Sequence, residues 1–144
     1  MPPEKNFDWQ QYIEFAEALS NTSQKNECIM RNIISRSYYG AFCLSREFAL
    51  KTGWITNEFS GADSHNKVIN AFYNSDYITK MELESQNIYQ RKRAVGEYLR
   101  DLKTYRIDAD YKNIYPSSNG RTLERDSEFA LKYANTIKNI INDL

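Results

Sequence analysis

The sequence predicts one all-α domain over residues 1–144, an up-and-down bundle of four to five helices. The chain has only 5 Gly and 3 Pro in 144 residues, and two of the prolines stand at positions 2 and 3. So few breakers favour long helices over a many-turned sheet. Apolar residues also recur at intervals of three and four along most of the chain, the period of a helix with one buried face. The length suits a single domain with a sizeable core.

Two helices are predicted in the N-terminal half. The first runs from Asp8, its expected cap, to about residue 19, and the polar run over 20–23 separates it from the second. The second runs from about residue 24 to 51, before Gly53. The apolar side chains that recur at helical spacing in these segments are Trp9, Ile13, Ala16, Leu19, Met30, Ile34, Tyr38, Ala41, Phe42 and Phe48.

A short helix and a long helix are predicted next. Residues 54–63 form a loop, and Ser64 caps a short helix over 65–73. The long fourth helix begins at about Ile78 or Glu82 and ends near residue 111. The apolar residues expected on the inner faces of these helices are Val68, Ile69, Phe72, Ile88, Val95, Leu99, Leu102, Tyr105 and Ala109.

The last helix is predicted from about residue 123 to 144. It follows a loop over 112–122 that contains Pro116 and Gly120. Its expected inner face consists of Phe129, Ala130, Tyr133, Ile137 and one of Ile140 and Ile141. With no internal repeat or linker in the sequence, these helices are expected to form one bundle with a short crossing third helix.

Composition excludes several functional classes. The 19 basic and 19 acidic residues cancel, so any binding to nucleic acid must come from a local patch. With two cysteines outside a CxxC motif and His65 as the single histidine, we expect no metal site, and we expect no cofactor. No stretch approaches the roughly 20 apolar residues of a membrane span, and the N-terminus has no signal-peptide pattern. We therefore expect no membrane association and a cytoplasmic location.

Arg106 is the first candidate functional residue. On the fourth helix it lies beside the apolar stripe, and Asp110 follows one turn later on nearly the same line, so the two can pair. An arginine beside a buried stripe is partly desolvated, which strengthens the effect of its charge. Two interpretations stay open: a structural Arg–Asp clamp between helices, or an anion-binding group.

Other polar residues allow a structural and a functional interpretation as well. His65 is either a capping or packing histidine or a catalyst. A basic sector on the fourth helix and a surface arginine on the second are either solvated faces or phosphate ligands. These candidate nucleic-acid-binding residues are Arg36, Lys92, Arg93, Arg100 and Lys103.

Three segments in this order resemble the HEPN superfamily, in particular its small stand-alone branch. They are residues 36–42 (RSYYGAF), 64–72 (SHNKVINAF) and 99–111 (LRDLKTYRIDADY). The resemblance spans about residues 10 to 144. It implies a homodimeric helical bundle, often a metal-independent RNase of toxin–antitoxin, phage-defence or CRISPR-linked systems. Other members of the family pair with a minimal nucleotidyltransferase.

The sequence departs from the family's catalytic signature, an arginine followed four to six residues later by a histidine. Arg106 matches the arginine, but Tyr111 stands where the histidine is expected, and the apolar Ile107 follows the arginine. A tyrosine with an ordinary pKa near 10 is a poor base at neutral pH. His65 supplies the imidazole only if the fold brings it near Arg106.

Two functions therefore remain. The first is an RNA-targeting toxin or defence effector with an active site of Arg106, Asp110, Tyr111 and His65. The second is a non-catalytic dimeric module that binds a nucleotide, RNA or a nucleotidyltransferase.

Overall fold

The computed structural model describes residues 7–56, 63–73 and 86–144, and within these segments it contains helices and loops but no strand. The helices are α1 (Gln10–Ser20), α2 (Glu27–Lys51), α3 (Asp63–Tyr73), α5 (Gln86–Tyr111) and α6 (Leu123–Asp143). The all-α prediction is thus confirmed. The predicted start of the fourth helix, at Ile78 or Glu82, lies outside the described residues.

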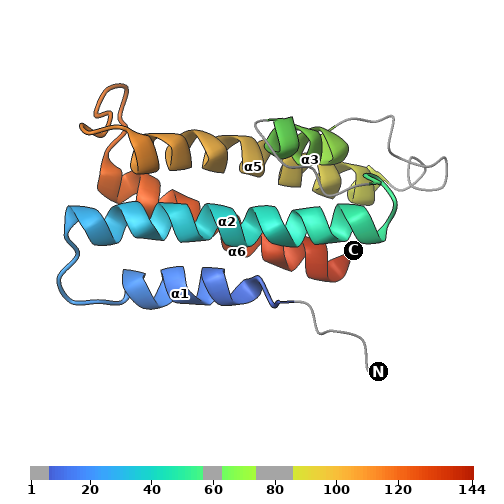
Figure 1. Cartoon of the computed structure of the whole chain (residues 1–144), viewed down its shortest axis with the longest axis horizontal. Helices are drawn as coiled ribbons and strands as arrows, with labels where there is room; N and C mark the ends of the chain where they lie inside the picture. The colour runs from blue at the N-terminus through green and yellow to red at the C-terminus, as the bar shows by residue number, and fades with distance from the viewer. Residues whose placement is uncertain (1–6, 57–62, 74–85) are drawn as a thin grey trace.

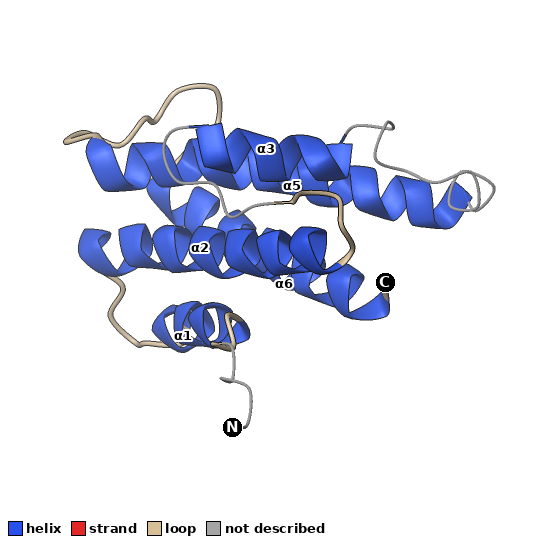
Figure 2. Cartoon of the chain, turned by 45° about the vertical axis from the view of Figure 1, so that its right-hand side comes forward, coloured by secondary structure: helices blue, strands red, loops and turns tan. Residues whose placement is uncertain are grey.

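The long helix α2 forms the centre of the bundle. It packs against α1, α5 and α6, and α3 rests mainly on α5 with a smaller contact to α2. Figure 1 shows α1 and α5 on opposite sides of α2, and the successive long helices alternate in direction. Figure 2 shows the same arrangement from another side, with α3 lying over α5. Among the described residues, none of the helices combines the length and the apolarity that crossing a membrane requires.

The buried faces follow the predicted apolar spacing. Most of the residues expected in the core are buried, and Trp9, Phe48, Tyr105 and Tyr133 pack at its edge. The α2 helix contributes the largest share because partners surround it, and even Ser37 and Ser45 are buried there.

The helix caps differ from the prediction in three places. α2 begins at Glu27 rather than at about residue 24, and its cap is Asn26, whose side chain accepts the backbone N–H three residues on at 2.9 Å. Ser64 lies inside α3, which begins one residue earlier. Asp8 precedes the first turn of α1 by two residues, yet its carboxylate still accepts the backbone N–H of Gln10 at 3.1 Å. Polar runs offer several possible caps, and packing selects among them.

Two helix contacts depend on glycine. A Cβ at Gly40 would lie 2.7 Å from Cγ1 of Ile13, so α1 approaches α2 closely only because no side chain intervenes. A Cβ at Gly96 would lie 3.0 Å from Cβ and 3.1 Å from the backbone nitrogen of Tyr73, the last residue of α3. This second contact fixes how α3 sits on α5.

A buried ion cluster holds the loop after α5. Arg121 lies 2.8 Å from Asp108 and 2.9 Å from Asp126, and both carboxylates are almost fully buried. The hydroxyl of Tyr115 donates to Asp126 at 2.5 Å. From α2, Arg31 donates to carbonyl oxygens at the end of α5, where the helix leaves its acceptors unpaired. The C-terminal end of α5 is therefore rigidly placed beside the N-terminal half of α2.

Candidate functional site

Arg106 joins α5 to α2 at the edge of the core. Its side chain is 13% exposed, and its Nε lies 3.0 Å from a carboxylate oxygen of Asp110, so the predicted ion pair is confirmed. Its Nη2 donates a hydrogen bond to the hydroxyl of Tyr39 on α2. Among the described residues, Nη1 has no hydrogen-bond partner. One edge of the guanidinium is thus held by the protein, and donor capacity remains.

Aromatic rings surround the Arg106 guanidinium. Its central carbon lies 5.0 Å from the ring centre of Tyr39, 5.4 Å from that of Tyr111 and 5.7 Å from that of Tyr38. Such faces attract a cation and hold a planar guanidinium in one orientation. Burial opposes the charge, but Tyr39, Tyr111 and Asp110 outweigh it and raise the pKa of Arg106. The residue is a permanent, oriented cation.

The fold brings His65 to the same place. From α3, its Nδ1 is hydrogen-bonded to the hydroxyl of Tyr38, the neighbour of Tyr39 in α2. Its ring stacks on Phe42 with centroids 4.3 Å apart and planes 18° apart. His65 and Arg106 therefore reach the same pair of adjacent tyrosines from two different helices. The capping interpretation of His65 is wrong, because α3 begins two residues before it.

His65 is neutral at pH 7. Burial lowers its pKa, and the positive charges of Arg106, Lys103 and Arg46 lower it further. Cations from α2 and α5 thus face one uncharged imidazole. The potential at this position favours an incoming anion.

The hydrogen-bond partner of His65 determines which of its ring nitrogens carries the proton. Tyr38 is fully buried, and burial raises the pKa of its hydroxyl, so the hydroxyl keeps its proton. Nδ1 of His65 is its hydrogen-bond partner, and a buried donor needs an acceptor. Nδ1 therefore accepts, and the proton of the neutral ring lies on Nε2. A neutral His65 ring with its proton on Nε2 therefore lies within the electrostatic influence of the Arg106 cation.

Two of the predicted nucleic-acid-binding residues lie apart from this centre. Lys92 is 2% exposed, and its ammonium lies 4.1 Å from the ring centre of Trp54, so it belongs to the core and not to the exposed basic sector. Trp54 comes from the segment after α2, a non-local contact that a helical wheel does not include. Arg36 lies over the ring of Tyr12 at 5.6 Å, on the α1 side of α2.

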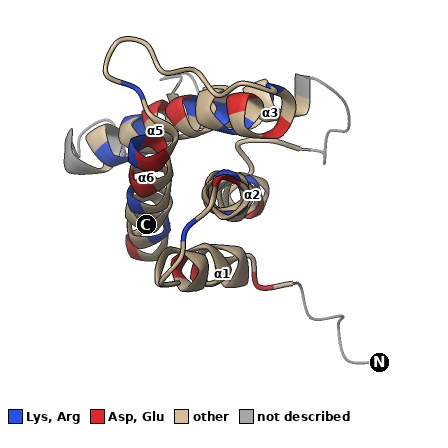
Figure 3. Ribbon diagram, turned by 90° about the vertical axis from the view of Figure 1, so that its left-hand side faces the viewer, with Lys and Arg blue, Asp and Glu red and all other residues tan. Residues whose placement is uncertain are grey.

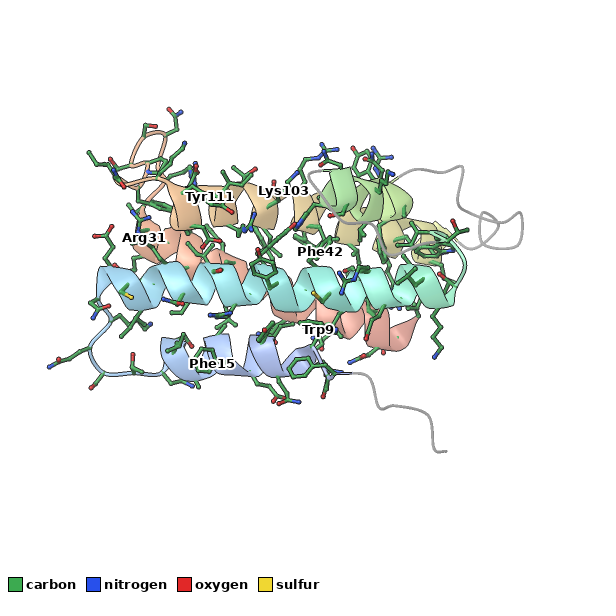
Figure 4. All side chains as sticks on the ribbon, in the orientation of Figure 1. Trp9, Phe15, Arg31, Phe42, Lys103 and Tyr111 are labelled. Carbon is green, nitrogen blue, oxygen red and sulfur yellow. The ribbon has the colours of Figure 1, made fainter. Side chains whose placement is uncertain are left out.

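The remaining basic residues of α5 line its contact with α3. Arg93 donates to the Tyr73 hydroxyl at 3.0 Å, and the Arg100 guanidinium lies 4.7 Å from the centre of the same ring. Lys103 is closer to the site: its ammonium donates to Asn66, the neighbour of His65, at 2.9 Å. Basic and acidic residues are interspersed along the helices (Figure 3). Figure 4 places Lys103 and Tyr111 on α5 and Phe42 on the facing side of α2.

Sequence reasoning placed Tyr38 on the apolar face of the second helix and assigned no role to Tyr39 or Arg46. One signal could have found them: positions 35, 39, 42 and 46 of α2 follow each other at intervals of four, three and four, so they share one face. That face of α2 faces the side of α5 that carries Arg106.

Comparisons with known proteins found no match. No protein-family model matches this sequence, and no curated protein or solved structure is significantly similar to it. Within the described segments, no group of three or more His, Cys, Asp and Glu side chains is placed to hold a metal ion. The groups that the structure brings together here are the oriented guanidinium of Arg106 and the neutral imidazole of His65, with the charges of Lys103 and Arg46 acting on the ring.

Proposed function

We propose that this chain is an RNA-targeting protein of the HEPN type, in which Arg106 binds a phosphate of the RNA backbone. The observation that supports this best is the convergence of Arg106 and His65 on the adjacent Tyr38 and Tyr39. This sequence has Tyr111 where the family signature has a histidine, and His65 supplies an imidazole from another helix. A planar guanidinium with free donors suits a phosphate, which it can grip with two parallel hydrogen bonds.

Metal-independent cleavage is the activity we assign to this site first. The ribose 2′-hydroxyl attacks the adjacent phosphorus, its proton passes to a base, and the 5′-oxygen of the next nucleotide leaves with a proton. Arg106, oriented by Asp110, stabilises the negative charge that grows on the phosphoryl oxygens. For His65 to take the proton at Nε2, the ring must carry its own proton on Nδ1 and donate to the oxygen of Tyr38.

A second function is favoured by the same hydrogen bond. With the Tyr38 hydroxyl donating to Nδ1, the Nε2–H of His65 is a ligand for a phosphate oxygen and not a base. In that state the chain is a non-catalytic module that binds a nucleotide or RNA, or pairs with a nucleotidyltransferase. Catalysis requires the Tyr38 hydroxyl to turn away from Nδ1 of His65. This leaves a buried donor without an acceptor and costs roughly 1–3 kcal/mol. The size of this cost decides between the two functions.

We also propose that the protein acts as a cytoplasmic homodimer. Two large apolar side chains at the end of α5 are exposed: Ile107 is 39% exposed, and Ile114, just after the helix, is 87% exposed. An exposed apolar group beside a polar site is typical of a contact surface.

The test combines binding and cleavage of a labelled single-stranded RNA in the presence of EDTA. Wild type is compared with Arg106→Ala and His65→Ala, and with Arg36→Ala as the matched control on the α1 side. We expect wild type and the control to bind, and Arg106→Ala to lose binding at least tenfold. Cleavage that His65→Ala abolishes supports the nuclease; binding without cleavage supports the module. Equal binding by wild type and Arg106→Ala would refute both the nuclease and the RNA-binding module.

A further inference from the structure

A groove of about 680 Å³ lies between the N-terminal half of α2 and the C-terminal end of α5. Arg31 and Asn32 line it from α2, and Asp110 and Tyr111 line it from α5. Figure 4 shows the labelled Arg31 and Tyr111 near each other at this end of the bundle. Its volume lies in the range of small-molecule sites and suits a nucleoside.

The groove adjoins the group of side chains around Arg106. Asp110 has one oxygen 3.0 Å from Nε of Arg106, and the same oxygen lies 3.5 Å from the hydroxyl of Ser35, which lines the groove. The Tyr111 ring lies against the Arg106 guanidinium and also lines the groove. A ligand with a phosphate on Arg106 therefore continues directly into this space.

Both cations in the groove wall, Arg31 and Lys112, are already engaged, and Lys112 lies 2.8 Å from Asp108. Arg31 contacts Glu27 at 3.0 Å and donates to carbonyl oxygens of Ala109 and Lys112 at 2.8 and 2.7 Å. Its role is to hold the wall, and its charge is largely neutralised there. The groove is thus less suited to a second phosphate than to the uncharged part of a nucleotide.

Two polar side chains that line the groove, Asn32 and Asp110, have an acceptor oxygen available. The amide nitrogen of Asn32 donates to the backbone oxygen of Cys28 at 2.9 Å, which leaves its oxygen unpartnered among the described residues. The second carboxylate oxygen of Asp110 is likewise without a partner in the described part of the chain. Tyr111, with 70% of its surface exposed, offers a flat ring. Such a wall is complementary to a base that stacks on one face and donates N–H groups at its edge.

We propose that this groove is a base-binding subsite for the nucleoside next to the phosphate on Arg106, and that it prefers guanine. Guanine presents two neighbouring donors, N1–H and the 2-amino group, toward the oxygens of Asn32 and Asp110, and it stacks on Tyr111. This inference rests on the proposed RNA binding and adds its sequence preference.

The test uses fluorescein-labelled hexaribonucleotides and fluorescence anisotropy. Three probes are compared: hexauridylate, the same chain with one guanine, and the same chain with one abasic ribose. Each probe is measured with wild type, Tyr111→Phe, Tyr111→Ala, Asn32→Ala and Arg106→Ala. Tyr111 is largely exposed, so its replacement leaves the fold intact, and the phenylalanine variant keeps the stacking ring.

We expect the guanine probe to bind wild type roughly tenfold more tightly than the abasic probe, the effect of one stacked base. Tyr111→Phe keeps this ratio, Tyr111→Ala reduces it to near one, and Asn32→Ala lowers the preference for guanine over uracil. Arg106→Ala weakens all three probes alike.

Equal affinity of wild type for all three probes, with Arg106→Ala still weaker, would overturn the subsite and leave the Arg106 phosphate site standing. If wild type binds none of the three probes, or if Arg106→Ala binds them as tightly as wild type does, the proposed function itself is overturned. An unchanged guanine-to-abasic ratio in Tyr111→Ala, together with a shift from dimer to monomer, would assign Tyr111 to a protein contact and refute the subsite.

Discussion

The hydroxyl of Tyr38 in α2 is hydrogen-bonded to Nδ1 of His65 in α3, so a fully buried tyrosine fixes the ring of the single histidine in the chain. This bond has two consequences that can be measured separately. One concerns the dependence of stability on pH, and the other concerns which ring nitrogen carries the proton.

The first prediction concerns His65 and pH. Burial and the charges of Arg106, Lys103 and Arg46 lower its pKa in the folded state below the unfolded value, about 6.5. Below that pH the unfolded chain therefore binds more protons, and stability falls as the pH falls. Urea unfolding at pH 7.5 and 5.5 should show this loss in wild type.

The control for that experiment is His65→Asn, whose side-chain oxygen can still accept from Tyr38. Other groups titrate over the same range, so the informative quantity is the difference between wild type and variant. We expect a smaller loss in the variant. An equal loss in both proteins would show that His65 does not carry the effect.

The second prediction concerns the tautomer. Nitrogen-15 NMR of labelled histidine at pH 7.5 should show the proton of His65 on Nε2 in wild type. Tyr38→Phe removes the donor to Nδ1, so we expect a mixture of the two tautomers and a loss of about 1–2 kcal/mol in the free energy of unfolding. A wild-type ring protonated on Nδ1 would contradict the assignment and favour the nuclease over the binding module.

The fold was predictable from local patterns, since helical spacing and scarce breakers are properties of neighbouring residues. The Arg106–Asp110 pair was predictable for the same reason, because both partners lie on one helix, one turn apart. The meeting of His65 with Arg106 was not, because it depends on how α3 sits on α5. That position is set by the close contact of Gly96 with Tyr73, which only the tertiary structure reveals.

The basic sector illustrates the same limit. A helical wheel groups Lys92 with Arg93, Arg100 and Lys103, but it contains no information on what covers each side chain. Trp54 covers Lys92 in the structure, and Tyr73 lies against both arginines. Of these four basic residues, only Lys103 is among the charges that lower the pKa of His65.

The third prediction concerns Phe42. It is almost fully buried in α2 and stacks on His65, so Phe42→Ala deletes a large side chain from the core and removes one wall of the site. We expect a loss of about 3–5 kcal/mol in the free energy of unfolding, measured by chemical denaturation. Phe15→Ala, an exposed position in α1, serves as control and should change stability little. A loss below about 1 kcal/mol at Phe42 would contradict its place in the core.

The fourth prediction concerns association. We expect wild type to be a dimer at micromolar concentration in light scattering, and the double variant Ile107→Asp with Ile114→Asp to be monomeric. Both side chains are exposed in one chain, so the change should not unfold it. Phe15→Asp, with a similarly exposed aromatic on α1, is the matched control and should remain dimeric. A monomeric wild type would refute the dimer.

The last prediction separates the two interpretations of Arg106. Arg121 is a structural clamp: it lies between Asp108 and Asp126, which are both buried, so Arg121→Ala should cost about 3–5 kcal/mol. Asp110, the partner of Arg106, is 26% exposed and can turn to water, so the ion pair itself contributes little stability.

We therefore expect Arg106→Ala to lower the free energy of unfolding by only about 1 kcal/mol, mainly through the lost hydrogen bond to Tyr39. RNA binding should nevertheless be lost, and Arg106→Lys should not restore it, because an ammonium lacks the planar fork that two phosphate oxygens accept. Thermal unfolding and RNA anisotropy on the same preparations give both quantities. A variant that melts as early as Arg121→Ala yet binds RNA like wild type would make Arg106 a clamp and remove it from the site.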